Sequence, residues 1–338
     1  MLKKETAMRQ LQITAREAGQ RLDRYLEKYM PQAQKSFFYK MFRKKNITLN
    51  GRKAAGNERL QEGDTVALFL AEDTIAKFRG GEDSFQKVAK QEGKLPMPPV
   101  IYEDEELLVL NKPPGMLSQK AGKEDVSLVE CITEYLLGDN LDTTFRPGIC
   151  NRLDRNTTGL VMAGKTVGSL QYLNQLFKER ALDKYYLCLV QGRVKKGAKV
   201  NGYLVKDEIH NRVAVSKEKK DGAARIITAY EPVETGNLRG QEYTLLKVKL
   251  VTGKSHQIRA HLQSIGHPVV GDAKYGEKAT HQLFHREFDV RYQLLHAWKL
   301  KLGQPEYLPE KYRGMEFTAP LPEHFIQVLR GLGMQRGS

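Results

Sequence analysis

The polar stretch from residue 71 to 97 is the feature that most limits how this chain of 338 residues can fold. It combines mixed charge, weak periodicity, a Gly-Gly pair and a Pro cluster, which is typical of a linker between packed segments. The chain is also longer than one ordinary domain. We therefore expect two folded units, with the boundaries N-terminal tail 1–12, small unit 13–72, linker 73–97, large unit 98–330 and C-terminal tail 331–338.

The small unit has the pattern of a compact α+β module. Apolar residues recur at helical spacing from Leu22 to Met30 and again after Pro31. Residues 47–52 then predict a strand, an Asn-Gly turn and a second strand, and residues 62–68 predict a turn followed by a strand. Two short helices and a small sheet are expected.

Positive charge is concentrated in the same region. The first 70 residues hold fifteen Lys and Arg but seven Asp and Glu, which is more than half of the net charge of +15 in about a fifth of the chain. A merely solvated basic face is the plainer alternative, but charge on a compact module favours contacts with phosphates. The candidate RNA-binding residues are Lys35, Lys40, Arg43, Lys44, Lys45 and Arg52.

Several classes of protein are disfavoured by composition. The three cysteines, Cys131, Cys150 and Cys188, contain no C-x-x-C pair, so we expect neither a disulfide framework nor a zinc site. The sequence has no run of 18 apolar residues, which a membrane span would need. Its first residues also lack the apolar core of a signal peptide. We expect a cytoplasmic protein with no membrane partner, no metal and no cofactor.

The large unit alternates short β-like runs with helical stretches. Examples are the runs at 107–110, 160–162, 186–190 and 244–251 and the helical stretch at 170–177. We expect one α+β domain with a mixed, mainly antiparallel sheet flanked by helices and loops.

Residues 151–160 contain the first candidate catalytic residue. Asp154 lies between Arg152 and Arg155 in a polar loop that enters an apolar run. A carboxylate with cationic neighbours stays charged, as a nucleophile or a base requires. The alternative is a structural ion pair in a turn.

The same tetrapeptide, Arg-Leu-Asp-Arg, occurs a second time at Arg21–Arg24. There Asp23 lies within a helical pattern that continues past it, so we expect it on the surface or at a helix cap. The tetrapeptide alone therefore does not identify a catalytic aspartate. The Asn-Thr-Thr-Gly after Asp154, which predicts a loop and the entry to a strand, distinguishes the copy at Arg152–Arg155 from the copy at Arg21–Arg24.

Residues 250–261 predict a strand that ends at Gly253 and a helix whose first turn is rich in donors. His256 and His261 are five residues apart, which does not place them on one helical face as a metal site of the H-E-x-x-H type would require. Arg259 and Gln257 are the better candidates, as groups that orient an anion.

Residues 159–166 match the P-loop expression G-x-x-x-x-G-K-[ST], with Lys165 as its lysine. The four variable positions are strand-like, whereas a P-loop exposes backbone N–H groups there. A P-loop nucleotide hydrolase is thus a remote alternative.

Two resemblances join these observations. The small unit, with GQRLDRYL, ITLNGRK and LQEGDTVAL in this order, resembles the alpha-L RNA-binding module. The large unit resembles the RluA-type family of ribosomal and transfer RNA pseudouridine synthases. The family's blocks match Leu108–Gly115, Arg152–Gly159, Lys184–Gly192, Gly253–His261, Gly266–Asp272 and Leu295–Ala297. The family usually has His at the position of Asn151, and Ser more often than Thr at that of Thr158.

The resemblance implies an isomerase that converts uridine to pseudouridine in RNA without a cofactor. It assigns Asp154 as the essential carboxylate, Tyr186 as the residue that packs on the base, and Arg259 as the partner of Asp154. Arg152 would fill the gap left by an extruded uridine, and Arg155 would bind RNA, with Thr158, Ile258 and Gln257 supporting the pocket. Large-subunit ribosomal RNA is favoured, transfer RNA is possible, and a monomer is expected. A non-catalytic RNA-binding ribosome-assembly factor is the main alternative.

Overall fold

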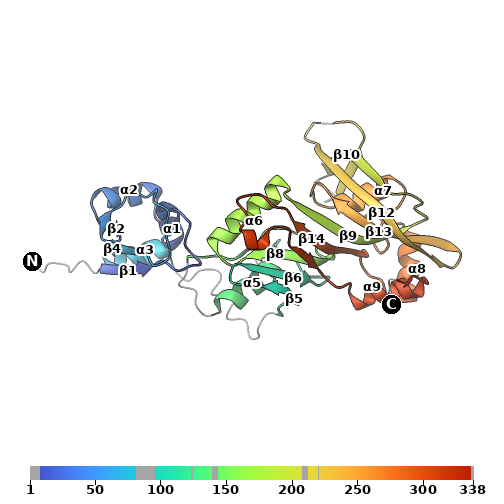
Figure 1. The fold of residues 1–338 in the computed structure, drawn as a ribbon, viewed down its shortest axis with the longest axis horizontal. Coiled ribbons are helices and arrows are strands. Elements are labelled where there is room, and N and C mark those ends of the chain that lie inside the picture. The colour runs from blue at the N-terminus through green and yellow to red at the C-terminus, as the bar shows by residue number, and fades with distance from the viewer. Residues whose placement is uncertain are drawn as a thin grey trace, which may run out of the picture.

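Two separate β-sheets organise the chain. The computed structural model describes residues 8–80, 96–122, 125–138, 144–207, 212–219 and 221–335. A four-stranded sheet lies in the N-terminal part and an eleven-stranded sheet in the rest, and Figure 1 shows the smaller unit at one end of the molecule. Within the described residues, no helix has the length and apolar character needed to cross a bilayer.

The N-terminal unit packs three helices with a sheet of order β1-β4-β2-β3. Its elements are β1 (Met8–Gln12), α1 (Leu22–Tyr29), α2 (Lys35–Arg43), β2 (Ile47–Leu49), β3 (Arg52–Lys53), β4 (Thr65–Phe69) and α3 (Glu72–Arg79). Leu22 and Leu26 of α1 and Phe38 and Phe42 of α2 are fully or almost fully buried, as their helical spacing predicts. The hairpin turns at Asn50 and Gly51, whose φ values of 50° and 72° suit the Asn-Gly pair.

Both expected boundaries of this unit are too narrow. Strand β1 pairs with β4 over its whole length, so the chain from Met8 is part of the sheet rather than of a tail. Helix α3 belongs to the unit too, because its Ile75 is fully buried in the same core. The pattern of β1 is a half-exposed edge strand, and α3 has one buried residue, so neither gives a strong periodic signal. Residues 81–95 of the expected linker lie outside the described residues.

The large sheet is mixed and mainly antiparallel, as expected. Strand β14 runs parallel to β8, and the other paired strands are antiparallel. In sheet order its strands are β11 (Arg212–Ser216), β10 (Ala198–Asp207), β12 (Ala224–Leu238), β13 (Gln241–Leu250), β9 (Leu182–Gln191), β14 (Leu295–Leu302), β8 (Thr158–Gly164), β6 (Leu107–Lys112) and β5 (Val100–Glu103), with β15 (Glu316–Thr318) on β14 and β7 (Gly148–Ile149) on β8.

Helices cover both faces of this sheet. They are α5 (Leu128–Leu137), α6 (Val167–Glu179), α7 (Gln257–Ser264), α8 (Lys278–Phe288), the short 3-10 helix at Glu310–Tyr312 and α9 (Glu323–Gly331). Alternate residues of β8 enter different cores: Val161 packs with residues of α5 and α7, whereas Leu160 packs with residues of α6. Because both faces are covered, β8 is buried throughout and, after Thr158, apolar.

The expected C-terminal tail from residue 331 is wrong in part. Leu332 and Met334 are almost fully buried in the core that contains α8 and α9. A Gly-rich, polar end of the chain gave no sign of this packing.

The segment between β1 and α1 joins the two units. The Glu17 carboxylate, almost fully buried, accepts hydrogen bonds from the backbone N–H and the hydroxyl of Thr144, at 2.9 and 2.8 Å. Beside it the Arg16 guanidinium donates to the carbonyl of Leu136, and the carbonyl of Arg16 accepts from the N–H of Val167. The small unit is thus in direct contact with the large one.

Candidate active site

A cavity of about 940 Å³ opens on the face of the large sheet that carries α7. Its walls come from the loop that holds Asp154, the start of β9, the end of β13, the first turn of α7 and the end of α6. Among the described residues that line it, Asp154 is the only carboxylate. The cationic side chains of the lining are Lys120, Arg152, Lys178, Arg180, Lys184, Lys254 and Arg259. A cavity of this composition attracts a polyanion.

Asp154 lies at the cavity wall as part of an ion-pair network of three residues. The Nη1 of Arg259 donates to Oδ2 of Asp154 at 2.9 Å, and the Asp154 side chain stays 23% exposed. The other edge of the guanidinium donates twice to the buried carboxylate of Asp272, at 2.6 and 2.8 Å. Arg259 therefore bridges a buried carboxylate and one that faces the cavity.

The electrostatics of this network keep Arg259 and Asp272 charged. Burial alone lowers the pKa of Arg259, but the hydrogen bonds and charge of Asp272 outweigh it and raise this pKa. Burial likewise raises the pKa of Asp272, while its bonds with Arg259 hold the pKa below the ordinary value. The N–H groups of Lys274 and Tyr275 also donate to Asp272. Asp272 thus fixes the guanidinium in place for Asp154.

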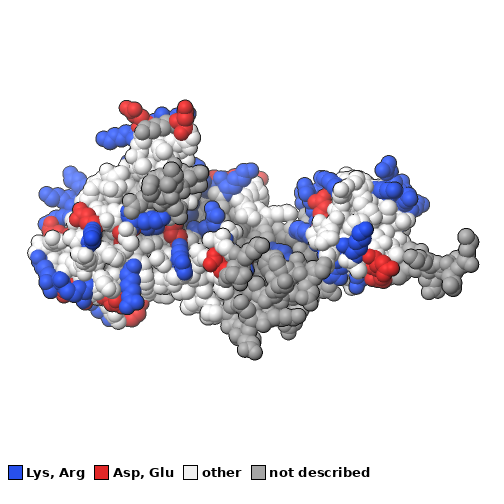
Figure 2. All heavy atoms as spheres, turned by 180° about the vertical axis from the view of Figure 1, so that it is seen from behind, with Lys and Arg blue, Asp and Glu red and all other residues white. Residues whose placement is uncertain are grey.

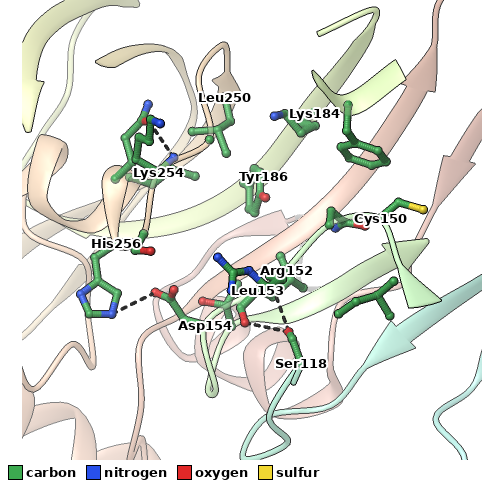
Figure 3. Close-up of a pocket in the computed structure, with 18 of the residues that line it drawn as sticks. Ser118, Cys150, Arg152, Leu153, Asp154, Lys184, Tyr186, Leu250, Lys254 and His256 are labelled. Carbon is green, nitrogen blue, oxygen red and sulfur yellow. Dashed lines mark hydrogen bonds and ion pairs between the residues drawn. The ribbon is translucent and has the colours of Figure 1, made fainter. Parts of the chain in front are cut away.

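Tyr186 forms the wall beside Asp154. It lies on β9, is 8% exposed and shares its core with Ile258 and Leu295, which also line the cavity. Burial and the nearby charge of Asp154 raise the pKa of its phenol, so the hydroxyl keeps its proton. Figure 3 shows Tyr186 between Asp154 and Lys184. An aromatic ring here can pack against a planar ligand.

Three polar side chains brace the loop around Asp154, and the first is the buried Lys112. Its ammonium donates to the carbonyls of Pro113, Met116 and Arg155, at 2.9, 2.9 and 2.8 Å. Burial lowers the pKa of Lys112 to about 7, opposed by the charge of Asp154.

The other two braces act closer to the carboxylate. The Ser118 hydroxyl both accepts from the N–H of Leu153 and donates to its carbonyl, as Figure 3 shows. The Asn151 amide pairs with the backbone of β8 at Leu160 and Met162. Asn151, where the family usually has His, therefore ties the loop to the sheet.

The residues predicted to support the pocket have different roles. Ile258 lines the cavity. Gln257 also lines it, but its amide is fully used by Thr252, Lys254, Ile227 and Thr228, so the expectation that it orients an anion is wrong. The Thr158 hydroxyl lies outside the cavity lining and bonds His296, which joins β8 to β14.

The two arginines that flank Asp154 differ as well. Arg152 is exposed and lines the cavity, with Gln119 as a neighbour at 3.5 Å. Arg155 is exposed but lies outside the lining, and its Nε donates to the carbonyl of Gly115. Arg155 thus helps to hold the loop.

The P-loop match is contradicted. Gly159 to Gly164 lie in the buried strand β8, and a Cβ at Gly159 would meet the carbonyl oxygen of Ala297 at 2.2 Å. Lys165 bonds Glu103 and the carbonyl of Asp104, both at 2.6 Å. Gly159 therefore allows the close contact of β8 with β14. Residues 159–166 do not form a loop that could bind a phosphate.

In the small unit, Asp23 lies within helix α1, as expected, but it is fully buried rather than on the surface. By contrast, the basic candidates of α2 and the hairpin are all exposed, and none of them is paired with a carboxylate among the described residues. These are Lys35, Lys40, Arg43, Lys44, Lys45 and Arg52. Figure 2 shows Lys and Arg side chains along the top of this unit, where α2 lies in Figure 1.

Sequence reasoning missed Lys112 and Asp272 as functional residues. Both stand in the blocks that resemble the family, but a lone lysine or aspartate does not reveal that it will be buried. For His256 the sequence suggests no role besides the excluded one of metal ligand. In the structure its Nδ1 lies 3.0 Å from the hydroxyl of Tyr275, and its Nε2 lies 4.0 Å from Asp154. In the described part of the chain, no three His, Cys, Asp or Glu side chains are grouped as a metal site would need.

Comparison with known proteins agrees with this geometry. Residues 106–264 match the family model described as RNA pseudouridylate synthase. An uncharacterized RNA pseudouridine synthase of Mycoplasma pneumoniae is 30% identical over 324 residues, which cover 93% of this chain and 95% of that protein. The ribosomal large subunit pseudouridine synthase C of Vibrio cholerae is 28% identical over 320 residues, covering 92% and 93%.

A solved structure supports the fold. Human RNA pseudouridylate synthase domain containing 4 has a TM-score of 0.55 and 21% identity, and the match covers 69% of this chain and 92% of that one. The chain therefore belongs to the RluA-type family of RNA pseudouridine synthases, and it is an isomerase that acts on uridine in RNA.

Proposed function

We propose that Asp154 is the essential catalytic carboxylate and that the natural substrate is large-subunit ribosomal RNA. The observation that carries the first part is the Asp154–Arg259 pair, because it presents a charged carboxylate in a basic cavity beside an aromatic ring. The second part is supported by the relatives, several of which are named for the large ribosomal subunit.

The reaction needs no external reagent. The bond from N1 of uracil to C1′ of ribose breaks, the base turns, and C5 forms a bond with the same C1′. C5 then loses its proton and N1 carries one, so the product is an isomer of the substrate.

Asp154 has two routes to this outcome. As a nucleophile it attacks C1′ and is later displaced by C5. As a base it takes the proton from C2′ and leaves a glycal, to which the proton returns. Both routes need an ionised carboxylate, and Arg259 is the ion-pair partner of Asp154.

Tyr186 is proposed to pack against the uracil and to assist in the loss of its C5 proton. Because its pKa is raised, the phenol holds its proton in the free enzyme, so packing is the role best supported by its surroundings. The apolar neighbours Ile258 and Leu295 extend the same surface.

A uridine inside a helix must leave the stack to reach Asp154, at a cost of a few kcal/mol. The exposed side chain of Arg152, two residues before Asp154, is proposed to fill the gap in the RNA. Arg155 and the basic face of the small unit, α2 with Arg52, are proposed to contact phosphates. We assign residues 8–79 to this alpha-L type RNA-binding unit, and we expect a cytoplasmic monomer.

Transcripts with tritium at C5 of uridine test the substrate, because the reaction releases that label. Unmodified large-subunit RNA, small-subunit RNA and transfer RNA should be compared at equal uridine concentration. We expect release from the large-subunit transcript, followed by mapping of the site in RNA from a deletion strain. Release from transfer RNA alone would contradict the ribosomal assignment. Tight binding to the large-subunit transcript with no release from any RNA would favour the assembly-factor alternative.

A further inference from the structure

The cavity extends well past Asp154, toward the C-terminal end of α6. At that end its lining contains Lys178, Arg180 and Lys184, from the last turn of α6, the connection to β9 and the start of β9. Lys184 is two residues before Tyr186 on the same strand, so the two Cα atoms are about 7 Å apart. A ligand packed on Tyr186 thus has a cluster of cations within the reach of one further nucleotide.

Lys184 is a partly buried ammonium with no carboxylate partner among the described residues. Burial and the charge of Arg180 both lower its pKa. A cation held away from water and beside a second cation is unfavourable unless an anion joins them. The protein provides none in the part of the chain that the structure describes.

Four lysines of the same sheet that do not line the cavity differ from Lys184, because each has a carboxylate partner. Lys249 pairs with Asp183 at 2.8 Å, and Lys247 pairs with Glu231 at 2.8 Å. Lys299 and Lys301 share Glu316. Carboxylate partners are therefore common on this sheet, and the lack of one for Lys184 among the described residues points to an external anion.

Arg180 has a further peculiarity. It takes the left-handed conformation at the end of α6, with φ 58° and ψ 32°, a position that glycine occupies most readily. An arginine there is strained, yet its side chain lines the cavity.

We propose that Lys184, Arg180 and Lys178 form a subsite for the RNA phosphate next to the target uridine. Three long cationic side chains suit one phosphate, which offers several acceptor oxygens and a full negative charge. The subsite fixes the backbone while the uracil packs on Tyr186 and its ribose meets Asp154. This inference rests on the proposed function, since it takes the extruded uridine as the occupant of the Asp154 end.

The first test replaces Lys184 by Met, which keeps the length of the side chain and removes its charge. The dissociation constant for the large-subunit transcript should rise about tenfold at low salt. The slope of log affinity against log salt should decrease by roughly 0.7, as expected for one lost phosphate contact. Lys184→Arg should restore most of both, and Lys249→Met, the matched paired lysine of the same sheet, should change neither.

The second test places one neutral methylphosphonate in a short transcript around the mapped uridine, at each neighbouring linkage in turn. One position should weaken binding of the wild type but not weaken Lys184→Met further, because the contact is already absent. Arg180→Gly gives an independent variant: it should melt at the same or a higher temperature, yet bind the transcript several-fold more weakly.

The outcomes separate this inference from the proposed function. No tritium release by the wild type from any transcript would overturn the proposed function and the subsite with it. An active wild type, with Lys184→Met unchanged in affinity and salt slope, would overturn the subsite alone. Additive losses from the variant and every methylphosphonate would do the same, since the two would then act at different places.

Discussion

The tetrapeptide Arg-Leu-Asp-Arg occurs twice in this chain, and its aspartate lies in a different structural environment each time. Asp23 lies in the first turn of α1, fully buried, and accepts from Nε and Nη2 of Arg21 and from the hydroxyl of Tyr39. Asp154 lies in a loop at the cavity, partly exposed, and its partner Arg259 is 105 residues away in the sequence.

The difference lies in where the counter-charge comes from. In the first copy the preceding arginine turns back onto the aspartate, so the ion pair is local and closed to ligands. In the second copy Arg152 lines the cavity, and the neutralising guanidinium comes from α7, where Asp272 holds it. The same four residues therefore stabilise a helix end in one place and leave a carboxylate ready for a substrate in the other.

Removing Arg259 should break the second arrangement most strongly. We expect Arg259→Ala to lower the turnover number by roughly 100- to 1000-fold, because Asp154 loses the hydrogen bond and the counter-charge that position its carboxylate. Lys165→Ala, which removes a cation outside the cavity, should leave turnover within about twofold. Single-turnover rates at saturating RNA, with melting curves for both variants, make the comparison. Equal losses in the two would contradict it.

Asp272→Asn should act through Arg259 with a smaller effect, a loss of roughly 10- to 100-fold in turnover.

The same variant, Asp272→Asn, also tests how stability depends on pH. The pKa of Asp272 is lowered in the folded protein, so its contribution to stability is present above its ordinary pKa of about 3.9 and is lost as the pH falls through the lower, folded value. Unfolding curves at several pH values should show this acid loss in the wild type and less of it in Asp272→Asn. Identical pH profiles would count against the ion pair.

Neutralising the basic face of α2 should affect binding and leave chemistry unchanged. With Lys35, Lys40, Arg43, Lys44 and Lys45 changed to Gln, each lost phosphate contact should reduce the slope of log affinity against log salt by roughly 0.7 to 0.9. The single-turnover rate at saturating RNA should stay as in the wild type. An unchanged slope would show that this face is not the RNA anchor.

Asp23→Asn should have the smallest effect on the reaction. Turnover at saturating RNA should stay within about twofold, because Asp23 is remote from the cavity. The small unit should lose roughly 1 to 3 kcal/mol of stability, since a buried carboxylate that holds Arg21 and Tyr39 is replaced. Denaturant melts of wild type and variant measure this. A large loss of turnover with intact stability would contradict the comparison.

Much of this organisation could be predicted from sequence. Helical spacing located α1 and α2, and the Asn-Gly pair located the hairpin, since both are local signals. The ordered family blocks named Asp154, Tyr186 and Arg259, which the fold brings to one cavity from the loop before β8, from β9 and from α7.

The features that sequence reasoning missed depend on long-range packing. Strand β1 has no strong pattern because, among the described residues, one of its two edges is paired. Leu332 is buried because the chain returns there to a core formed by α8, α9 and strands of the large sheet. The sequence suggests that the Gln257 amide donates to an anion, but in the structure this amide donates to the carbonyl of Ile227 in the neighbouring strand β12. The burial of Asp23 likewise depends on Tyr39, from the next helix.

The most direct measurement compares Asp154→Asn with Asp23→Asn, the same change in the two copies of one tetrapeptide. An amide keeps the shape of the carboxylate but can neither attack C1′ nor take a proton. We predict that Asp154→Asn releases no tritium from the large-subunit transcript while binding it within a few-fold of the wild type, and that Asp23→Asn releases it at the wild-type rate. Release by Asp154→Asn near the wild-type rate would contradict the account.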